Sequence, residues 1–472
     1  MPCNIKDEFA TIELGDQRRD ERLLRLAGSL AEDPSRSVRA SLKGEAEIKA
    51  GLRLLHNEHL SMEQILGTHR QAALLRASKL DPDEALLFIQ DTTELDFTTH
   101  KALQGAGPLS DFSLRGFHVQ NHLLASEVSG LALGLCSAKA WARKDEHFGK
   151  AKKRHHNRLP LEQKETFRWF EGYEEACKLA EELPSRQIIM VADRECDIFA
   201  IYERWWQPRK AGKPCADFIV RAMHDRNLSP DGSLFDALKE APLLGTYEVE
   251  VDRKRQIIKV KGNSRRYVRT ARTAKLEVRT LEVNLLAPQY AKGLKSVKVS
   301  AVLVEETNPP EGQTPIRWFL LTSLPVENLQ QAMRVVHCYT RRWLVEDFHR
   351  ILKSGCRVEA IRLRESAAML RAVALYMVIA WRILYLRDLS RTCPQVPASW
   401  FFTEAEQCAA ALIFRLPQSK PPSTLKELCI LVAKMGGYAA RKSDPPPGAE
   451  CMWRGLEKLR CYVEMGEALG AF

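Results

Sequence analysis

The chain has 472 residues, of which 45% are hydrophobic and 28% charged, so it is a globular protein with room for about two to four domains. Its net charge of +11 indicates a polyanionic partner. Twelve cysteines without one CxxC pair argue against a zinc ribbon and are typical of reduced thiols in a reducing compartment.

The N-terminal segment, residues 1–80, is predicted to be helical and polar. It opens without the basic and then apolar run of a signal peptide. Apolar residues recur at helical spacing in LGDQRRDERLLRLAGSLAED and in two later runs. The segment contains 13 Lys and Arg against 12 Asp and Glu, so any DNA binding must depend on how the basic side chains are arranged.

An α/β pattern begins near residue 85. An apolar strand ends at Asp91, further strands follow within 117–142, and a basic loop at 139–158 contains eight Lys and Arg against two acids. A helix then precedes a second apolar strand, which ends at Asp193. This order is expected of an RNase H-like domain, although it also fits other α/β folds.

Residues 245–325 show the alternation typical of β-strands, with eleven Lys and Arg and one acid between Arg253 and Arg279. We predict an inserted antiparallel sheet with one basic face. The longest apolar run, at 367–381, is interrupted by Arg371 and is too short to span a bilayer. A proline-punctuated tail follows, and its helices after residue 423 offer an apolar face for a subunit contact.

The stretch YTRRWLVEDFHRILK, Tyr339 to Lys353, is predicted to form one helix. At about 100° per residue, Tyr339, Arg342, Glu346 and Lys353 lie within an arc of roughly 60°. One face would therefore present a phenol, a guanidinium, a carboxylate and an ammonium group. The same pattern also fits a solvated face with i,i+4 ion pairs.

Three acids are candidate metal ligands: Asp91 and Asp193 at strand ends, and Glu346 on the charged helix. Ligands usually bind at strand ends along one edge of an α/β sheet. Clustered carboxylates repel one another unless hard cations neutralise them, and Mg²⁺ prefers oxygen ligands. Two such ions could activate a nucleophile and stabilise the leaving oxygen of a phosphodiester. Each Asp taken alone is better explained as a helix N-cap or a turn residue.

Together, IQDTTELDF, VADRECDI and YTRRWLVEDFHRILK resemble the three catalytic blocks of the Tn-five (IS fifty) transposase and the wider IS-four group of DDE cut-and-paste transposases. The last block fits the Tyr-(two residues)-Arg-(three)-Glu-(six)-Lys signature of that group. LGDQRRDERL resembles the start of its DNA-binding domain, and NPPEGQTPIRWFLLTSLPVE resembles the end of its β insertion. The resemblance covers nearly the whole chain, with the far C-terminus only loosely matched.

The resemblance implies a role for each candidate residue. Asp91, Asp193 and Glu346 would be the catalytic ligands of two Mg²⁺ ions, for which Mn²⁺ can substitute. The implied DNA contacts are Tyr339 and Arg342 on the terminal phosphate, Lys353 on the backbone nearby, Trp318 stacking a flipped base, Arg221 on a phosphate, and Arg18, Arg19, Arg22 and Arg53 on the terminal repeat. For the four N-terminal arginines, an ordinary surface position is an equally good explanation.

The implied fold is α/β. An RNase H-like catalytic domain at 81–389, interrupted by the β insertion at 245–325, would lie between a helical DNA-binding domain at 1–80 and a helical dimerisation region at 390–472. The implied enzyme is a Mg²⁺-dependent DNA endonuclease and strand transferase. It would bind inverted-repeat ends and target DNA as a homodimer in the bacterial cytosol, associated with the nucleoid and without membrane contact.

Two other interpretations stay open. The chain could be a catalytically inactive or domesticated DNA-binding protein, or an inhibitor of transposition, although intact acids at all three positions favour the active enzyme. A hydrolase of the same fold that cleaves structured nucleic acid would leave the end-binding N-terminal domain unexplained.

Overall fold

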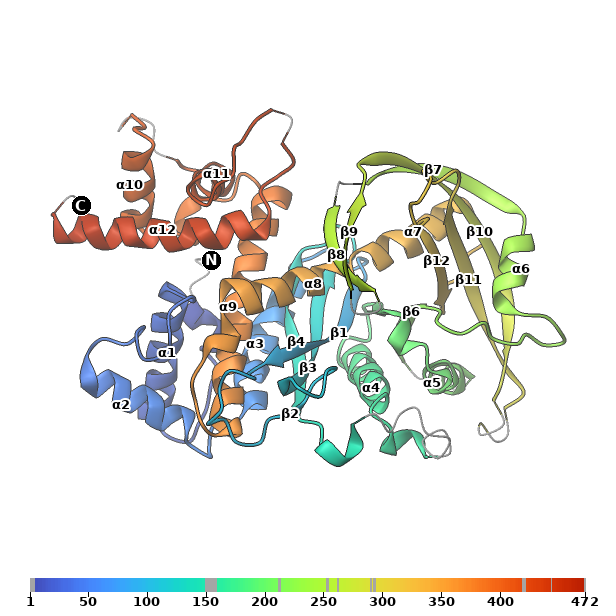
Figure 1. The fold of residues 1–472 in the computed structure, drawn as a ribbon, viewed down its shortest axis with the longest axis horizontal. Coiled ribbons are helices and arrows are strands. Elements are labelled where there is room, and N and C mark those ends of the chain that lie inside the picture. Colours follow the sequence, from blue (N-terminus) through green and yellow to red (C-terminus); the bar gives the residue numbers. More distant parts are fainter. Residues whose placement is uncertain are drawn as a thin grey trace. The chain divides into compact units, whose positions relative to one another are not determined.

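The computed structural model describes residues 5–148, 159–210, 214–251, 254–260, 263–288, 291, 294–417, 422–442 and 444–470. The chain divides into two compact units: unit 1 comprises Met1–Pro160 and Trp343–Phe472, and unit 2 comprises Leu161–Arg342. Figure 1 shows the elements of both units. These boundaries differ from the domain boundaries expected near 80 and 389, which stay predictions.

Unit 1 begins with helices, as the apolar spacing predicted: the short η1 (Ile5–Phe9), then α1 (Gln17–Glu32), α2 (Gly44–Leu55) and α3 (Met62–Ala77). α1 starts where the side chain of Asp16 accepts a hydrogen bond from the backbone N–H of Arg18. α3 starts with a capping box between Ser61 and Gln64. Local sequence signals therefore define where these helices begin.

Unit 1 also contains antiparallel strands: β1 (Leu86–Asp96), β3 (Arg115–Ser126) and β4 (Ala132–Trp141), with the short β2 (Gly107–Pro108) paired to β3. The prediction that the first apolar strand ends at Asp91 is wrong. β1 continues to Asp96 because β3 pairs with it along its full length, beyond the point where the apolar run stops. Asp91 therefore lies within a strand, directly opposite Asn121.

The C-terminal part of unit 1 consists of η9 (Ala398–Trp400), α10 (Glu404–Ile413), α11 (Leu425–Met435) and α12 (Ala449–Ala468). α11 and α12 pack closely at two glycines. A Cβ at Gly455 would lie 1.9 Å from the carbonyl oxygen of Val432, and one at Gly436 would lie 1.9 Å from that of Cys451.

The apolar face of α11, expected at a subunit contact, is instead buried within this chain. That expectation is wrong because α12 and the preceding long helix cover the face.

That long helix, α9 (Ser366–Thr392), is the core of unit 1 and contacts α1, α2, α3, β4, α11 and α12. The helix extends beyond the apolar run at 367–381, and with 27 residues it is long and apolar enough, by length and composition alone, to cross a membrane. However, 83% of its most apolar window is buried inside the fold. Its polar groups are paired: Nε1 of Trp381 donates to the carbonyl of Ala132, and Arg371 donates to the carbonyl of Leu55, both at 2.8 Å.

The segment from Tyr339 to Lys353, predicted to be one helix, is divided into three. α7 (Leu329–Thr340) belongs to unit 2, whereas α8 (Trp343–Arg350) and a π-helical turn, η7 (Ile351–Gly355), belong to unit 1. At the break, the N–H of Arg342 donates to the carbonyl of Tyr339, three residues back, at 3.1 Å. The prediction of one continuous stripe is wrong, because a tight turn and a wide π turn both change the angle between successive side chains.

Unit 2 combines helices with a mixed set of strands: α4 (Phe167–Glu182), β5 (Ile188–Ala192), α5 (Phe199–Lys210), β6 (Asp217–Arg221), α6 (Leu234–Glu240), β7 (Leu243–Val251), β10 (Arg272–Leu286), β11 (Ser296–Glu306) and β12 (Arg317–Thr322). β5 and β6 are parallel, and antiparallel pairing continues from β6 through β12, β11 and β10 to β7. β8 (Lys254–Val260) and β9 (Asn263–Arg269) form a separate hairpin. Part of the predicted basic loop, residues 149–158, lies outside the described residues. The side chains of this hairpin, which belong to the predicted basic face, also lie outside them. Unit 2 also has short turns of 3₁₀ helix at η5 (Leu161–Gln163) and η6 (Arg194–Cys196), and unit 1 has further ones at η2 (Asp145–His147) and η8 (Val358–Ala360).

A buried ion pair fastens η1 to α3. The carboxylate of Glu8, 2% exposed, accepts hydrogen bonds from His69 at 2.7 Å and from Arg76 at 2.7 and 2.9 Å. Burial raises the pKa of Glu8, but the contacts with His69 and Arg76 outweigh burial and hold that pKa at about 2. A carboxyl group whose pKa is lower in the folded state stabilises the fold above its unfolded pKa. That stabilisation is lost as the pH falls toward the folded pKa.

Glu8→Gln should therefore lower the free energy of unfolding by about 3 kcal/mol at pH 7. The difference from wild type should shrink as the pH falls from 4.5 toward 2, where the wild-type carboxyl becomes protonated. Urea denaturation at pH 7 and at pH 3 measures this difference, with the exposed Glu58→Gln as the control. An equal loss at both pH values would contradict the assignment of Glu8 as a buried anion.

Candidate functional site

Two of the three predicted metal ligands lie in unit 1. Asp91 is half-buried on β1, where its carboxylate accepts a hydrogen bond from the backbone N–H of Thr92 at 2.8 Å. Glu346 is half-buried in the first turn of α8, where the helix dipole favours a negative charge. α8 packs on β1, so the two carboxylates are carried by elements in contact within one unit.

Polar contacts on two sides hold α8. Nδ2 of Asn121, the residue opposite Asp91 on β3, lies 2.9 Å from Nε2 of His349 on α8. Asp347, the neighbour of Glu346, forms an ion pair with Arg387 of α9, which is 4% exposed. The helix that carries Glu346 is therefore tied to the strands of unit 1 and to its core helix.

The third predicted ligand, Asp193, lies in unit 2. It directly follows β5, as predicted, and one of its carboxylate oxygens accepts a hydrogen bond from the N–H of Glu195 at 2.8 Å. Nearby Asp197 has a different environment: it is buried and accepts hydrogen bonds from the hydroxyl of Tyr202 at 2.7 Å and the N–H of Met223 at 2.8 Å. These contacts give Asp197 a structural role.

Four of the predicted DNA-contacting residues gather in unit 2. The rings of Trp318, on β12, and Tyr339, in the last turn of α7, lie 5.4 Å apart in an edge-to-face arrangement. Tyr339 is 3% exposed, and Arg342, which is 8% exposed, contributes positive charge at its phenol. Arg221 ends β6, pairs with Leu320 of β12, and contributes positive charge at Tyr339. We call Trp318, Tyr339, Arg342 and Arg221 the aromatic–arginine cluster.

The electrostatics of this cluster suit an anion. Burial raises the pKa of Tyr339, and the charge of Asp193 raises it further, whereas Arg342 and Arg221 act in the opposite direction. A phenol is already protonated at neutral pH, and the raised pKa of Tyr339 keeps it a hydrogen-bond donor at still higher pH. A phenol donor beside two guanidinium groups can bind a phosphate.

Among the residues that the structure describes, no three His, Cys, Asp or Glu side chains form a group that could hold a metal ion. Asp91 and Glu346 belong to unit 1 and Asp193 to unit 2. The set of three ligands therefore stays a prediction. Its chemistry fits Mg²⁺ and Mn²⁺, because carboxylate oxygens are the donors that these ions prefer.

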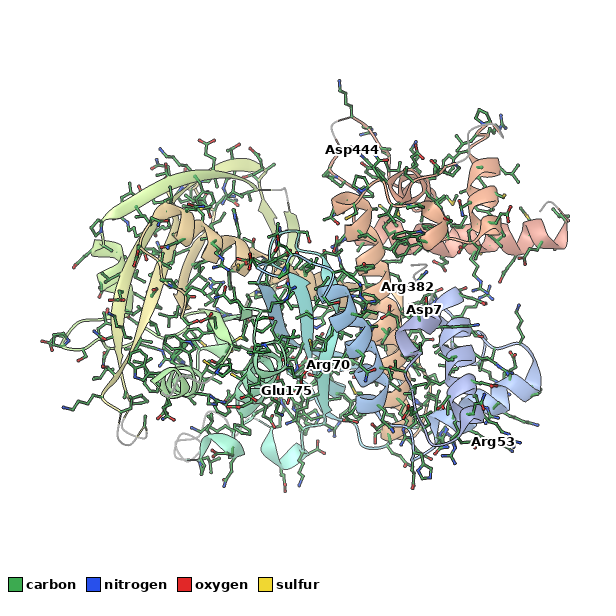
Figure 2. All side chains as sticks on the ribbon, turned by 180° about the vertical axis from the view of Figure 1, so that it is seen from behind. Asp7, Arg53, Arg70, Glu175, Arg382 and Asp444 are labelled. Carbon is green, nitrogen blue, oxygen red and sulfur yellow. The ribbon has the colours of Figure 1, made fainter. Side chains whose placement is uncertain are left out.

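The four predicted N-terminal arginines differ in environment. Arg18, Arg22 and Arg53 are exposed, and Figure 2 shows Arg53 on the N-terminal helices. Arg19 is half-buried and donates to the carbonyl of Leu14 at 3.3 Å. Arg19 therefore has a structural contact. Among the hydrogen bonds that the structure describes, the side chains of Arg18, Arg22 and Arg53 make no such contact.

A hollow of about 350 Å³ lies between α1 and α2. Its lining includes Arg18, Arg22 and Arg25, together with Glu21 and Glu47. Arg25 was not among the predicted contacts. Its spacing of seven from Arg18 and three from Arg22 places it on the same helical face, and that spacing could have identified it.

Lys353, the last signature residue, and Trp343, which lies between Arg342 and Glu346, both belong to unit 1. Lys353 is half-buried on η7. Trp343, the first residue of α8, is 51% exposed and directly follows Arg342. Trp343 was not among the predicted site residues, because composition alone does not separate an exposed tryptophan from the buried ones. Its position next to a signature arginine was the available signal.

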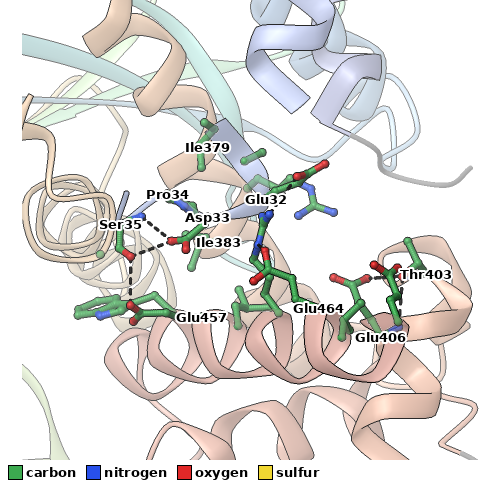
Figure 3. Close-up of a pocket in the computed structure, with 18 of the residues that line it drawn as sticks. Glu32, Asp33, Pro34, Ser35, Ile379, Ile383, Thr403, Glu406, Glu457 and Glu464 are labelled. Atoms are coloured by element: carbon green, nitrogen blue, oxygen red, sulfur yellow. Dashed lines mark hydrogen bonds and ion pairs between the residues drawn. The ribbon is translucent and has the colours of Figure 1, made fainter. Parts of the chain in front are cut away.

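Another hollow, of about 310 Å³, lies in unit 1 between the N-terminal helices and α12 (Figure 3). There Ser35 donates to Glu457, and Arg460 donates to Glu32, both at 3.1 Å. The lining contains four further acids: Asp33, Glu406, Glu464 and Glu467. This number of carboxylates would repel phosphate. The hollow is therefore a packing boundary between two segments of unit 1 and not a nucleic-acid site.

Three family models match the chain. They are Transposase DNA-binding over residues 4–60, Transposase DDE domain over residues 174–381, and Transposase Tn5 dimerisation domain over residues 378–470. The first range contains the hollow between α1 and α2. The second contains Asp193, the aromatic–arginine cluster and Glu346, and Asp91 lies before its start.

Proposed function

Because the three matched domains give the chain the architecture of a Tn5-type transposase of the IS4 group and make it a DDE transposase, we propose that it moves its element by cut and paste. In the proposed reaction, one strand is nicked at each inverted-repeat end, and the freed 3′-hydroxyl attacks the opposite strand to form a hairpin. The hairpin is then reopened, and the 3′-hydroxyl ends are joined to target DNA.

The observation that carries this proposal is the aromatic–arginine cluster. Strands β6 and β12, helix α7 and the turn after it supply its members, which the sequence resemblance had assigned to DNA at the transposon end. Tyr339 and Arg342 would bind the terminal phosphate, with Arg221 beside them. Trp318 would stack the displaced base, since an indole offers a large π-face next to the phosphate site.

Asp91, Asp193 and Glu346 are the proposed ligands of two divalent ions, Mg²⁺ or Mn²⁺. Such ions, when bound, supply activation of the water or 3′-hydroxyl nucleophile and stabilisation of the leaving oxygen. Two observations support this ligand set. Asp91 and Glu346 are half-buried on elements that pack together, and Asp193 follows β5 in the unit that contains the aromatic–arginine cluster.

The finer domain plan is also part of the proposal. The DDE domain implies an RNase H-like fold. The antiparallel strands from β7 to β12 would be an insertion at 245–325 in a catalytic domain at 81–389. The segment at 1–80 would read the terminal repeat through Arg18, Arg19, Arg22 and Arg53, and Lys353 would contact the backbone nearby.

The matched domains support DNA binding and homodimer formation. We place the subunit contact in the region 390–472, on the end of α12. Tyr462, Met465 and Leu469 follow one another at helical spacing there and are 36%, 56% and 76% exposed. The specific partners would be the inverted-repeat ends and target DNA, and the site of action the bacterial cytosol at the nucleoid.

The three acids provide the first test. Asp91→Ala, Asp193→Ala and Glu346→Ala should each abolish Mg²⁺- or Mn²⁺-dependent cleavage of an element end and leave end binding largely intact, because a metal ligand is removed while the phosphate-binding residues remain. Cleavage and gel-shift assays measure the two effects, with the exposed Glu195→Ala as the control. Near wild-type cleavage by any one variant would remove that residue from the set. No cleavage by the wild-type chain would favour an inactive DNA-binding protein.

Trp318→Ala should permit the first nick but slow hairpin formation about 5- to 150-fold, which corresponds to the loss of about 1–3 kcal/mol of stacking. An abasic site at the flipped position should partly restore the rate, because no base then needs a stacking surface. Trp318→Phe, which retains a π-face, is the matched control. Single-turnover assays that resolve nicked and hairpin products test this assignment. Wild-type rates for both steps would make Trp318 a packing residue.

Replacing Arg18 and Arg22 together by Ala should weaken binding to the element end. The slope of log K against the logarithm of the salt concentration should become shallower by about two, one for each phosphate that is no longer neutralised. Titrations at several salt concentrations measure this slope. Arg454→Ala, an exposed arginine on α12, is the control. An unchanged slope would mean that the hollow between α1 and α2 does not face DNA.

A further inference from the structure

The contact between Asn121 and His349 links the carriers of two proposed metal ligands. Asn121 lies directly opposite Asp91 in the β1–β3 pair, and opposite residues of an antiparallel pair project to the same face. His349 lies three residues after Glu346, so these two side chains are neighbours on one face of α8. The contact therefore joins the strand and the helix immediately beside each carboxylate.

The contact is polar and buried. Asn121 is fully buried and His349 is 9% exposed. The 2.9 Å separation of Nδ2 and Nε2 fits an amide that donates to a neutral imidazole. Within the part of the chain that the structure describes, Oδ1 of Asn121 has no hydrogen-bond partner. An apolar pair would fill the same space without an unpaired amide oxygen, so stability does not explain the polar contact.

Neighbouring polar residues of β3 make a different kind of contact. Gln120 donates to Gln90 of β1 at 2.8 Å, and His122 bonds to Ser137 of β4 at 2.7 Å. Successive side chains of a strand alternate between its two faces, so Gln120 and His122 project away from the face that Asn121 occupies. These pairs join strand to strand, whereas Asn121 joins a strand to α8.

We propose that Asn121 and His349 are positioning residues that hold Glu346 at the separation from Asp91 that divalent-metal binding requires. The inference rests on the proposed function of these two carboxylates. Asn121 and His349 themselves contact neither metal nor DNA. They act through the residues beside them, as outer-shell partners of metal ligands do, and loss of such partners typically weakens metal affinity about 10- to 100-fold.

Mn²⁺ binding by the full chain on a duplex of its element end tests this inference, with the duplex alone as background. The EPR signal of free Mn²⁺ reports binding without any need for catalysis. Asn121→Ala and His349→Ala should each weaken Mn²⁺ affinity about 10- to 100-fold and leave end binding unchanged. The Mn²⁺ concentration that gives half-maximal nicking should rise by the same factor. The double variant should lose no more Mn²⁺ affinity than the single variant with the lower affinity, because all three variants remove the same contact.

Gln120→Ala is the matched control, since it removes an equally buried amide from the adjacent position of β3. Its Mn²⁺ affinity should equal that of wild type. Wild-type affinity in both single variants overturns the inference, and so does an equal loss in Gln120→Ala. If Asn121→Ala does not fold, Asn121→Leu preserves the volume and should show the same loss, and wild-type affinity there also overturns the inference.

Asp91→Ala and Glu346→Ala separate this inference from the proposed function. Wild-type Mn²⁺ affinity in these two variants would remove both carboxylates from the metal site and end the proposed function as stated. Loss of affinity in these two variants, with none in Asn121→Ala and His349→Ala, would overturn the positioning role alone.

Discussion

Burial of α9 is the constraint on which the rest of unit 1 depends. A helix that is apolar on all sides is stable in water only when other elements cover every side of it, at about 25 cal/mol per Å² of apolar surface removed from water. The cover comes from the N-terminal helices, β4, and the C-terminal helices α11 and α12. The matched DNA-binding and dimerisation domains therefore pack on one shared helix, although more than 300 residues separate their starts (378 − 4 = 374).

The signature residues are divided by a helix break. Tyr339 lies in the last turn of a helix of unit 2 and Arg342 in the turn that follows it, where β-strands supply Trp318 and Arg221 around the phenol. Glu346 lies in the first turn of a helix of unit 1 that packs on the strand of Asp91. The signature residues are close together in the sequence but lie in two different packing environments. The phosphate-binding and metal-binding roles proposed for these residues rest on different sets of neighbours.

The order of helices and strands was largely predictable, because apolar spacing and helix caps are local signals. The errors occurred where a distant element acted. β1 extends beyond Asp91 because β3 continues to pair with it, and the apolar face of α11 is covered by α9 and α12. α9 is long and apolar enough to span a membrane but is a core helix, because other elements of the fold bury it. Hydropathy alone does not report this burial. The break at Arg342 has no proline or glycine to mark it, since the stretch reads YTRRWL.

The sequence by itself determined which residues are candidates for the chemistry: the acids at positions 91, 193 and 346, and the phenol, guanidinium and ammonium groups at fixed spacing around the last of them. Residue type and spacing are properties of the chain, so a single sequence shows them. Only the tertiary structure decided that Trp318 and Arg221 lie beside Tyr339, and that Asn121 contacts His349 on the helix of Glu346. These contacts join residues about 20 to 230 positions apart, and they form because the close packing of helices and strands fixes which distant side chains meet.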